Sequence, residues 1–302
     1  MKVTPIVADS LGARSMCTFV ETRDCKVLLD PSVRLGPWRY DLPPHPMEKE
    51  REKELWRRIK EVAKTADVCT VSHYHYDHHN PDAPSLFRKK TLYVKDGKKN
   101  TNRSQAGRAQ HFLAEVKKYP ATLAVADGKT FEHGATTIRF SKAVPHGIDT
   151  RLGCVVMTSI REGTQCVVHT ADVTGPPRTE HLSFLLQEEP DILICDGPLA
   201  YMLEEYGESN VRRSEANLVR VIGSTPIKTL ILEHHLLRAK DWRAVMPKVL
   251  IAAESAGVRV CNAAEFLGKK VEQMEAHRHE LYGVSAGPER KEEDPGSPPR
   301  TL

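Results

Sequence analysis

Long apolar stretches are missing from this chain of 302 residues. No run approaches the roughly 18 residues that a membrane-spanning helix needs. The N-terminal segment MKVTPIVADSLG is too short and too polar for a signal peptide. Hydrophobic residues make up 40% and charged residues 28% of the sequence, as in ordinary globular proteins. We therefore expect a cytoplasmic protein that does not associate with membranes.

Paired cysteines and a strong charge of one sign are missing as well. The seven cysteines are widely scattered, never form a CxxC pair, and mostly lie in apolar runs such as ILICDG. This pattern argues against a disulfide framework or a cysteine-based zinc finger and predicts buried, reduced thiols. The net charge is only +4 and the isoelectric point about 8.6, which permits an anionic substrate without requiring one.

The chain also lacks an internal repeat, and it contains no linker before residue 283. Short β-type runs alternate with helical patterns, among them a helix over 47–64, a second helix through QHFLAEVKKY and one long helix from about Asp241. The last stretch contains four prolines and almost no apolar residues. We expect one α/β domain over residues 1–282, with helices covering the outer faces of layered sheets, and a disordered tail over 283–302.

Histidine and aspartate are concentrated in TVSHYHYDHHNPD, residues 70–82, which follows an apolar strand. His73 and His75 are two positions apart and therefore lie on one side of an extended segment. Asp77 and His78 follow where the chain can turn. Imidazole and carboxylate are the ligands that Zn²⁺, Fe and Mn take in hydrolytic sites. The cluster predicts a metal site that could hold two ions about 3.5–4 Å apart.

The motif HYHYDHH resembles the HxHxDH signature of the metallo-β-lactamase superfamily, and the order of features is similar over roughly residues 1–270. The stretches LGPWRYDLPPHP, NRSQ, DVTGP and EHHLLR resemble an uncharacterised, mainly archaeal branch of predicted metal-dependent hydrolases. This resemblance implies a four-layer αβ/βα sandwich with a metal cleft at one edge of two facing sheets.

The resemblance also implies three further ligands at strand ends. The matching positions are His146 in IRFSKAVPHG and Asp172 in CVVHTADVTGP, a carboxylate that would keep two cations close together. For the last ligand, LILEHHLLR offers His234 and His235, and His234 is preferred because it follows the strand directly. The other histidine is expected to point elsewhere, for example into the cleft as a proton donor, since neighbouring strand residues face opposite sides. The implied ligands are His73, His75 and His146 for one ion, Asp77, His78 and His234 for the other, and Asp172 between them.

An open binuclear site of this kind is typical of hydrolysis, because two cations that share a water convert it to a bridging hydroxide near neutral pH. We predict a binuclear metal-dependent hydrolase that acts on a phosphodiester, an ester or a lactone. Two divalent ions are expected, with Zn²⁺ as the first choice and Fe or Mn as alternatives. Asp77, Asp172 and His235 are the expected catalytic residues, and His79 and His169 are further candidates for a general acid.

Substrate contacts and supporting residues are less sharply defined by the sequence. Arg103, Ser104 and Gln105 match the NRSQ stretch of the branch and are the expected substrate-binding residues. The basic residues around them could contact phosphates, although a solvated basic loop explains them equally simply. Asp30 and Asp196 each follow a strand, where either could hold a ligand histidine in its tautomer or merely form a turn.

Several classes of function remain alternatives at this point. The chain has no insertion like that of the β-CASP nucleases and no arm like that of the tRNA-processing nucleases, so a small or anionic substrate is favoured over nucleic acid. An iron-dependent oxidoreductase of the same fold would use the same ligands. A non-catalytic, metal-stabilised binding protein is the third alternative. The sequence does not define an oligomeric state.

Overall fold

The computed structural model describes residues 1–284 of the protein. The segment 283–302, expected to be a disordered tail, lies outside the described residues except for Gly283 and Val284.

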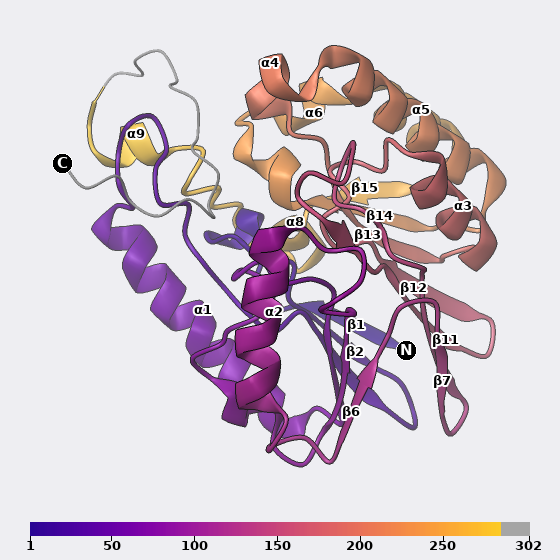
Figure 1. Ribbon diagram of the computed structural model, residues 1–302. Coiled ribbons are helices and arrows are strands. Elements are labelled where there is room, and N and C mark those ends of the chain that lie inside the picture. Colours follow the sequence, from indigo (N-terminus) through magenta and orange to yellow (C-terminus); the bar gives the residue numbers. More distant parts are fainter. Residues whose placement is uncertain (285–302) are drawn as a thin grey trace.

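Two mixed β-sheets face each other in the structure (Figure 1). The first has the strand order β1-β2-β3-β4-β5-β6, and the second β15-β14-β13-β12-β11-β8-β7. In each sheet antiparallel strands lead into parallel ones, which begin at the β3–β4 pair and at the β12–β13 pair. The first sheet comprises β1 (Lys2–Pro5), β2 (Thr18–Glu21), β3 (Lys26–Leu29), β4 (Val68–Val71), β5 (Thr91–Val94) and β6 (Thr122–Val125). The second comprises β7 (Thr130–His133), β8 (Thr136–Phe140), β11 (Thr158–Glu162), β12 (Gln165–His169), β13 (Ile192–Asp196), β14 (Thr229–Glu233) and β15 (Arg259–Cys261), and a separate short pair joins β9 (Val144–Pro145) to β10 (Cys154–Val155).

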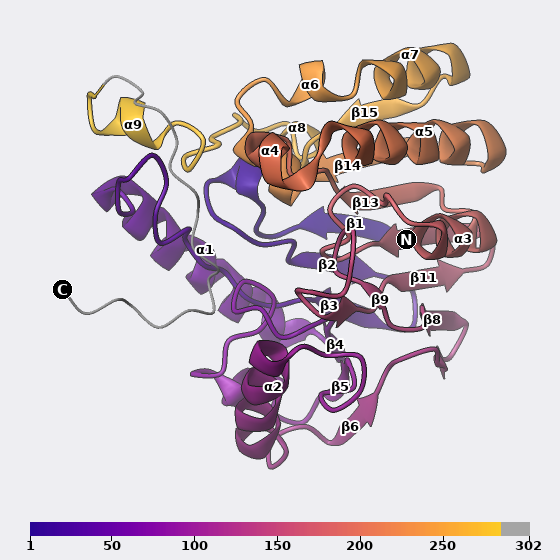
Figure 2. The same ribbon diagram turned by 45° about the horizontal axis from the view of Figure 1, so that its top comes forward.

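Helices cover both outer faces of this sandwich, with α1 (Pro46–Thr65) and α2 (Arg103–Val116) on one side and α3 (Thr179–Glu188) and α5 (Glu208–Ser224) on the other (Figures 1 and 2). The remaining α-helices are α4 (Leu203–Tyr206), α6 (Trp242–Val245), α7 (Pro247–Ala256), α8 (Ala263–Phe266) and α9 (Arg278–Leu281). Short 3₁₀ helices occur at η1 (Asp9–Leu11), η2 (Pro84–Phe87), η3 (Ala200–Met202) and η4 (His234–Arg238).

The alternation of side chains along the strands divides the core into layers. In β3, Leu28 packs with the cluster that contains Leu55 of α1, whereas Leu29 packs into a second cluster between the sheets. In β13, Ile194 joins that central cluster, and Leu193 faces the helices on the other side. Successive strand residues point to opposite faces, so each sheet is buried on both of them. This is the four-layer αβ/βα sandwich that the sequence predicted.

Some boundaries differ from those expected. Helix α2 begins earlier than predicted, at Arg103, because the side chain of Asn102 accepts a hydrogen bond from the backbone N–H of Gln105, at 2.8 Å. The single long helix expected from about Asp241 is wrong: it divides into α6 and α7 at Met246. The cause is Pro247, which disfavours helical geometry in the residue before it and starts a new helix well.

The predictions for cysteine and for membrane helices can also be compared with the structure. All seven cysteines are buried and form no disulfide, as predicted. Over residues 1–284, no helix is both long enough and apolar enough to span a membrane.

Candidate metal centre

The histidine-rich segment forms a tight turn at the end of β4. The backbone N–H groups of His78 and His79 donate to the carbonyl oxygen of His75, at 3.0 and 3.2 Å. This turn brings Asp77 and His78 back beside His73, whose ring lies 4.3 Å from that of His78. His73 and His78 are buried, while His75 and Asp77 are partly exposed. The segment therefore brings several ligand atoms together through its own backbone turn.

Three other strand ends bring further ligands to this turn. His146 follows β9, Asp172 follows β12 and His234 follows β14. Two groups of residues result, each of which could hold a metal ion, and within each group the ligand atoms lie within 4.8 Å of one another. The groups are His73, His75, His146 and Asp172, and Asp77, His78, Asp172 and His234. Asp172 belongs to both, so the structure assembles the residues of the predicted ligand set in the predicted partition.

Asp172 lies at the centre of the two groups. Its Oδ1 is 2.8 Å from Nε2 of His78. Its Oδ2 is 3.3 Å from Nε2 of His146 and 3.4 Å from Nε2 of His234. One carboxylate therefore faces imidazoles from both groups with both of its oxygens, which is the geometry expected of a ligand shared by two cations.

Left-handed backbone positions the ligands at two of these strand ends. His234 has φ of 58° and Ala171, directly before Asp172, has φ of 53°. Non-glycine residues in this region cost of order 1–3 kcal/mol and persist where the surroundings require them. At His234 the bend ends β14 and starts η4, so that its ring lies 4.5 Å from that of His235. The expectation that the two neighbouring histidines point in opposite directions was therefore wrong, because the backbone is not extended there.

A buried aspartate holds the first histidines in place. Asp30 accepts hydrogen bonds from the backbone N–H and the hydroxyl of Ser72, at 2.8 and 2.5 Å. Its Oδ2 also lies 2.8 Å from Nδ1 of His78. The Ser72 hydroxyl in turn lies 3.0 Å from Nδ1 of His73. With Nδ1 engaged in this way, Nε2 of each ring is directed at the centre, and Asp30 has the orienting role that the sequence left open.

Asp9 does the same for the last histidine. Its Oδ2 accepts from Nδ1 of His234 at 2.7 Å, and its Oδ1 accepts from Nε of Arg238 at 3.1 Å. Both contacts are buried. Sequence reasoning did not identify Asp9 or Arg238, since no spacing rule connects the segment around residue 9 with the end of β14. The only local signal was an aspartate placed between an apolar run and a glycine.

Several buried nitrogen and oxygen atoms at the centre have no hydrogen bond to the described residues, which is what atoms that bind a cation would show in a structure without the ion. Nε2 of His73, Nε2 of His146 and Oδ1 of Asp172 are buried and make no hydrogen bond with any part of the chain that the structure describes. An unsatisfied buried polar group costs about 1–3 kcal/mol. Several of them converging on one point fit a bound cation, which would use the lone pairs that the protein leaves unmatched.

Electrostatics at the centre favour positive charge. Burial lowers the pKa of His73 to about 4, so its ring is neutral and able to bind a metal. Burial opposes protonation of His234 as well, but the carboxylates of Asp172 and Asp9 raise its pKa to about 10. The imidazoles of His78 and His234 hold the pKa of Asp172 well below its usual range in spite of burial. The same negative field that stabilises a proton at this point would stabilise a divalent cation.

His235 occupies a separate position beside the ligands. Its Nδ1 lies 2.9 and 3.0 Å from the two carboxylate oxygens of Asp196, whose Oδ1 also accepts from the His235 backbone N–H at 3.1 Å. Its side chain is 9% exposed, and its ring lies 6.2 Å from that of His146. His235 belongs to neither ligand group. Asp196 thus orients this histidine and does not orient any of the predicted metal ligands.

The two other candidates for a general acid lie in different surroundings. Nε2 of His169 donates to the carbonyl oxygen of Met16 at 2.9 Å, and its Nδ1 accepts from the Ala171 backbone N–H at 3.3 Å, so both nitrogens are used within the protein. His79 is buried, and its Nδ1 donates to the His75 carbonyl at 2.9 Å. Both rings therefore stabilise the local fold, which leaves His235 as the best placed of the three.

The residues predicted to bind substrate form the first turn of α2. Arg103 is exposed and Ser104 partly exposed, whereas Gln105 is buried and its Nε2 donates to the carbonyl oxygen of Leu152, at 2.6 Å. Gln105 therefore anchors the loop that follows His146. Among the nearby basic residues, Lys95 is buried and its Nζ lies 3.0 Å from a carboxylate oxygen of Asp127, so it is part of the fold.

Comparisons with known proteins agree with this architecture. No family model matches the chain. A UPF0282 protein of Korarchaeum cryptofilum is 42% identical over 284 residues, which cover 93% of this chain and 94% of that protein. A UPF0282 protein of Sulfurisphaera tokodaii is 40% identical over 307 aligned residues, which cover all of this chain and 97% of that protein. These relatives are uncharacterised archaeal proteins, as the resemblance implied.

Solved structures show the same fold at low sequence identity. The metallo-β-lactamase fold protein YhfI of Bacillus subtilis has a TM-score of 0.52 and 17% identity, covering 86% of this chain and 94% of its own. An isothiocyanate hydrolase from Delia radicum gut bacteria has a TM-score of 0.50 and 14% identity, covering 86% and 95%. Zinc-bound PqqB of Methylobacterium extorquens has a TM-score of 0.51 and 12% identity, covering 87% and 98%. The protein therefore has the metallo-β-lactamase fold.

Proposed function

The chain belongs to the UPF0282 family, and we propose that it is a metal-dependent hydrolase that binds two divalent ions, with Zn²⁺ as the first choice. One observation carries this proposal: two groups of ligand atoms, each within 4.8 Å, share the carboxylate of Asp172. A structural zinc site is normally closed by four ligands around one ion, whereas a catalytic site leaves positions open for water and substrate. A shared carboxylate between two incomplete groups fits the second kind.

The ions would supply the reactive water and part of the charge stabilisation, because two nearby divalent cations lower the pKa of a shared water and neutralise a developing oxyanion. The protein supplies the geometry. Asp30 and Asp9 hold the rings of His78 and His234 by their Nδ1 atoms, so both rings keep Nε2 directed inward. Asp172, which is common to both groups, would orient the water that the ions hold.

In this proposal His235 exchanges a proton with the leaving group. Its Nδ1 is held by Asp196, which leaves Nε2 as the atom that would carry the proton. Its ring is 4.5 Å from that of His234 and therefore borders the second ligand group. The bond that is cleaved is proposed to be a phosphodiester or an ester or lactone, since both develop an oxyanion that a cation stabilises.

The experiment that tests this function combines metal analysis with a substrate screen. Protein purified without added metal is reconstituted with Zn²⁺, Mn²⁺ or Fe²⁺ and tested against phosphodiester, phosphomonoester, lactone and thioester substrates. We expect two ions per chain and turnover of at least one of these classes. One ion or none at saturating metal would contradict the binuclear assignment, and stoichiometric iron with visible absorption would contradict the zinc hydrolase.

A matched pair of variants separates a metal-dependent reaction from a contaminant. His75→Ala removes a ligand of the first group, whereas His111→Ala removes an exposed histidine on α2 that belongs to neither group. Activity that disappears with the first variant and survives in the second belongs to this site. Equal activity in both variants would assign the reaction to another protein in the preparation.

A further inference from the structure

Arg238 is a buried arginine at the edge of the second ligand group. Its Nη2 lies 3.2 Å from Nε2 of His234, the nitrogen that His234 would offer to a metal ion. Its side chain is only 4% exposed. A guanidinium does not help to hold a metal ion, because the two positive charges repel each other. Its position therefore calls for an explanation other than metal binding.

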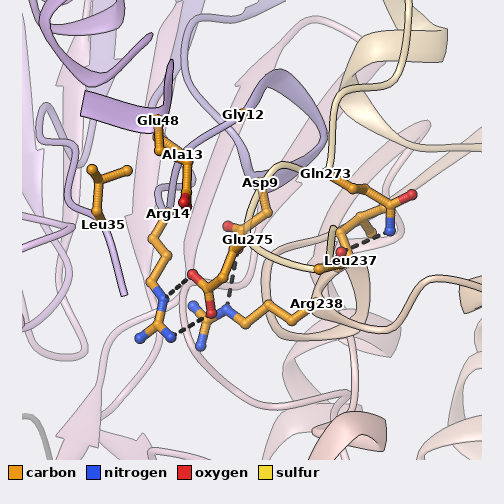
Figure 3. Close-up of a pocket in the computed structure, with 11 residues that line it drawn as sticks. Asp9, Gly12, Ala13, Arg14, Leu35, Glu48, Leu237, Arg238, Gln273 and Glu275 are labelled. Atoms are coloured by element: carbon orange, nitrogen blue, oxygen red, sulfur yellow. Dashed lines mark hydrogen bonds and ion pairs between the residues drawn. The ribbon is translucent and has the colours of Figure 1, made fainter. Parts of the chain in front are cut away.

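The guanidinium of Arg238 is held in one orientation. Its Nε donates to Asp9, as Figure 3 shows, and its Nη1 donates to the hydroxyl of Tyr201 at 3.1 Å. Arg39 stacks over the Tyr201 ring at 4.4 Å and donates from Nη2 to the carbonyl oxygen of Arg238 at 3.2 Å. Arg238 also ends the 3₁₀ helix η4, which begins with His234. The metal ligand and the guanidinium are thus fixed relative to each other by one short element and one carboxylate.

Metal binding at His234 would change what Arg238 can bind. Asp9 holds Nδ1 of His234, so its one remaining ring nitrogen is Nε2. Once Nε2 coordinates a cation, its lone pair is used and it cannot accept a hydrogen bond from Nη2 of Arg238. Loading the second ligand group would therefore leave Nη2 as an unmatched buried donor beside the cation. A buried donor in that position needs an acceptor, which an oxygen of a water or of the ligand that enters the site would supply.

The charge balance of the centre leads to the same requirement. Two divalent ions would bring four positive charges, against the three negative charges of Asp77, Asp172 and Asp30, whose Oδ2 lies 2.8 Å from Nδ1 of His78. The charge of Asp9 is already matched by its contact with Arg238, at 3.1 Å. Before any anion binds, the loaded site would thus keep one excess positive charge in a largely buried setting, which favours an anionic ligand over a neutral one.

A purely structural arginine in this protein is bound differently. Arg278 donates from Nε and Nη2 to the two carboxylate oxygens of Glu48, at 2.8 and 2.9 Å. Its Nη1 and Nη2 also reach the carbonyl oxygens of Leu42 and Gly36, at 3.1 and 2.9 Å. All of these acceptors are protein oxygens. Arg238, in contrast, directs Nη2 at an atom that a metal ion would claim.

We propose that Arg238, with the hydroxyl of Tyr201, binds an oxyanion group of the substrate beside the second ion. This inference rests on the proposed hydrolase function and narrows it to substrates that carry such a group, either a phosphoryl group or a carboxylate. Nη2 of Arg238 and the hydroxyl of Tyr201 suit both groups, because each group offers two acceptor oxygens. The anion enters from the metal side. The cavity shown in Figure 3, which Arg238 lines together with Asp9, Arg14 and Glu275, has a volume of only about 10 Å³ and holds at most about one water.

The test measures anion binding to the full chain, without relying on turnover. Zinc-loaded protein is titrated calorimetrically with inorganic phosphate, dimethyl phosphate and acetate, and zinc content is measured for every preparation. We expect the loaded wild type to bind phosphate and the metal-free protein to bind it far more weakly. Arg238→Gln should weaken phosphate binding about 10- to 100-fold, as loss of a charged hydrogen bond does. Tyr201→Phe should cause a smaller loss.

Further variants control for folding and for general charge. Arg238→Lys keeps the charge beside Asp9 but loses the fork, so it should fold and bind phosphate with intermediate affinity. If Arg238→Gln does not fold, the phosphate affinity of Arg238→Lys is measured in its place. Arg278→Lys makes the same change at the arginine paired with Glu48 and should leave phosphate affinity at the wild-type value.

The outcomes separate this inference from the proposed function. Wild-type zinc content with unchanged phosphate affinity in Arg238→Gln or Arg238→Lys would overturn the role of Arg238 and leave the hydrolase untouched. A wild-type protein that binds no metal would overturn the hydrolase before any anion is added. Dimethyl phosphate that binds more tightly than acetate would identify the group as phosphoryl, and the reverse order would identify it as a carboxylate.

Discussion

Around Arg278 every buried charge is matched by protein, because the guanidinium contacts both oxygens of Glu48 and two backbone carbonyls. The metal centre contains buried charges too, but His73, His146 and Asp172 keep atoms there without a hydrogen-bond partner in the described chain. Both regions are built from side chains far apart in the sequence. The difference teaches that burial of charge does not identify a functional site. What indicates the site is that several unmatched ligand atoms gather at one place.

The largest effect is expected from Asp172, the residue common to both ligand groups. Asp172→Asn keeps the shape but removes a negative charge next to two cations. A unit charge interaction at about 4 Å is worth ~4 kcal/mol near a protein surface. We therefore expect metal affinity to fall ~10³-fold or more at both positions. Elemental analysis after dialysis measures this, with His75→Ala as a control that should lose mainly one ion. Full metal content in Asp172→Asn would remove the basis of the two-ion assignment.

The next effect distinguishes the neighbouring histidines that end β14. His234→Ala should empty or weaken the second ligand group, because His234 belongs to it. His235→Ala should keep both ions and lose about 10²- to 10⁴-fold in rate, as enzymes do when a general acid is removed. Zinc content and turnover of the two purified variants decide the matter. A metal-poor His235→Ala with a metal-replete His234→Ala would mean that the two roles are exchanged.

At Arg278 the comparison predicts a loss of stability without a loss of metal. Arg278→Ala leaves the carboxylate of Glu48 buried and unpaired, which typically costs about 3–5 kcal/mol in the free energy of unfolding. Urea denaturation of the metal-free protein measures this cost, and elemental analysis should still find wild-type zinc content. Glu48→Leu combined with Arg278→Met should recover part of the stability, since an apolar pair needs no partner. Loss of zinc in Arg278→Ala would show that the two regions are energetically coupled.

The sequence predicted those parts of the centre that are local or that end a strand. His73, His75, Asp77 and His78 lie within one turn, so their spacing was sufficient evidence of proximity. The remaining ligand candidates were located only through the resemblance of their flanking stretches to a known superfamily. The layered arrangement was predicted from strands that alternate with helices, and the four-layer αβ/βα sandwich from the resemblance; strands with apolar side chains on both faces, such as Leu28 and Leu29 of β3, explain why it forms.

The parts that could not be predicted depend on backbone conformation or on contacts between distant segments. The left-handed φ of His234 changed the direction of its side chain, and no residue type at that position signals it. Asp9 and His234 lie 225 positions apart and meet only because η1 packs beside the end of β14. The break at Met246 was readable in principle, since Pro247 follows it, but the continuous apolar face concealed it.

The smallest predicted effect concerns Asp9, which contacts both the ligand His234 and the guanidinium of Arg238. Asp9→Asn keeps an oxygen that can accept from Nδ1 of His234 but removes the charge that orients Arg238. Loss of such an orienting partner usually costs about 10- to 100-fold in metal affinity. We expect that loss at the second ligand group only, measured by competition with a chelator, while Asp67→Asn, a change of an exposed carboxylate, leaves both affinities unchanged. An equal loss at both groups would mean that Asp9 acts on the general electrostatic field, because a residue that merely orients His234 cannot weaken ligands that follow β4 and β9.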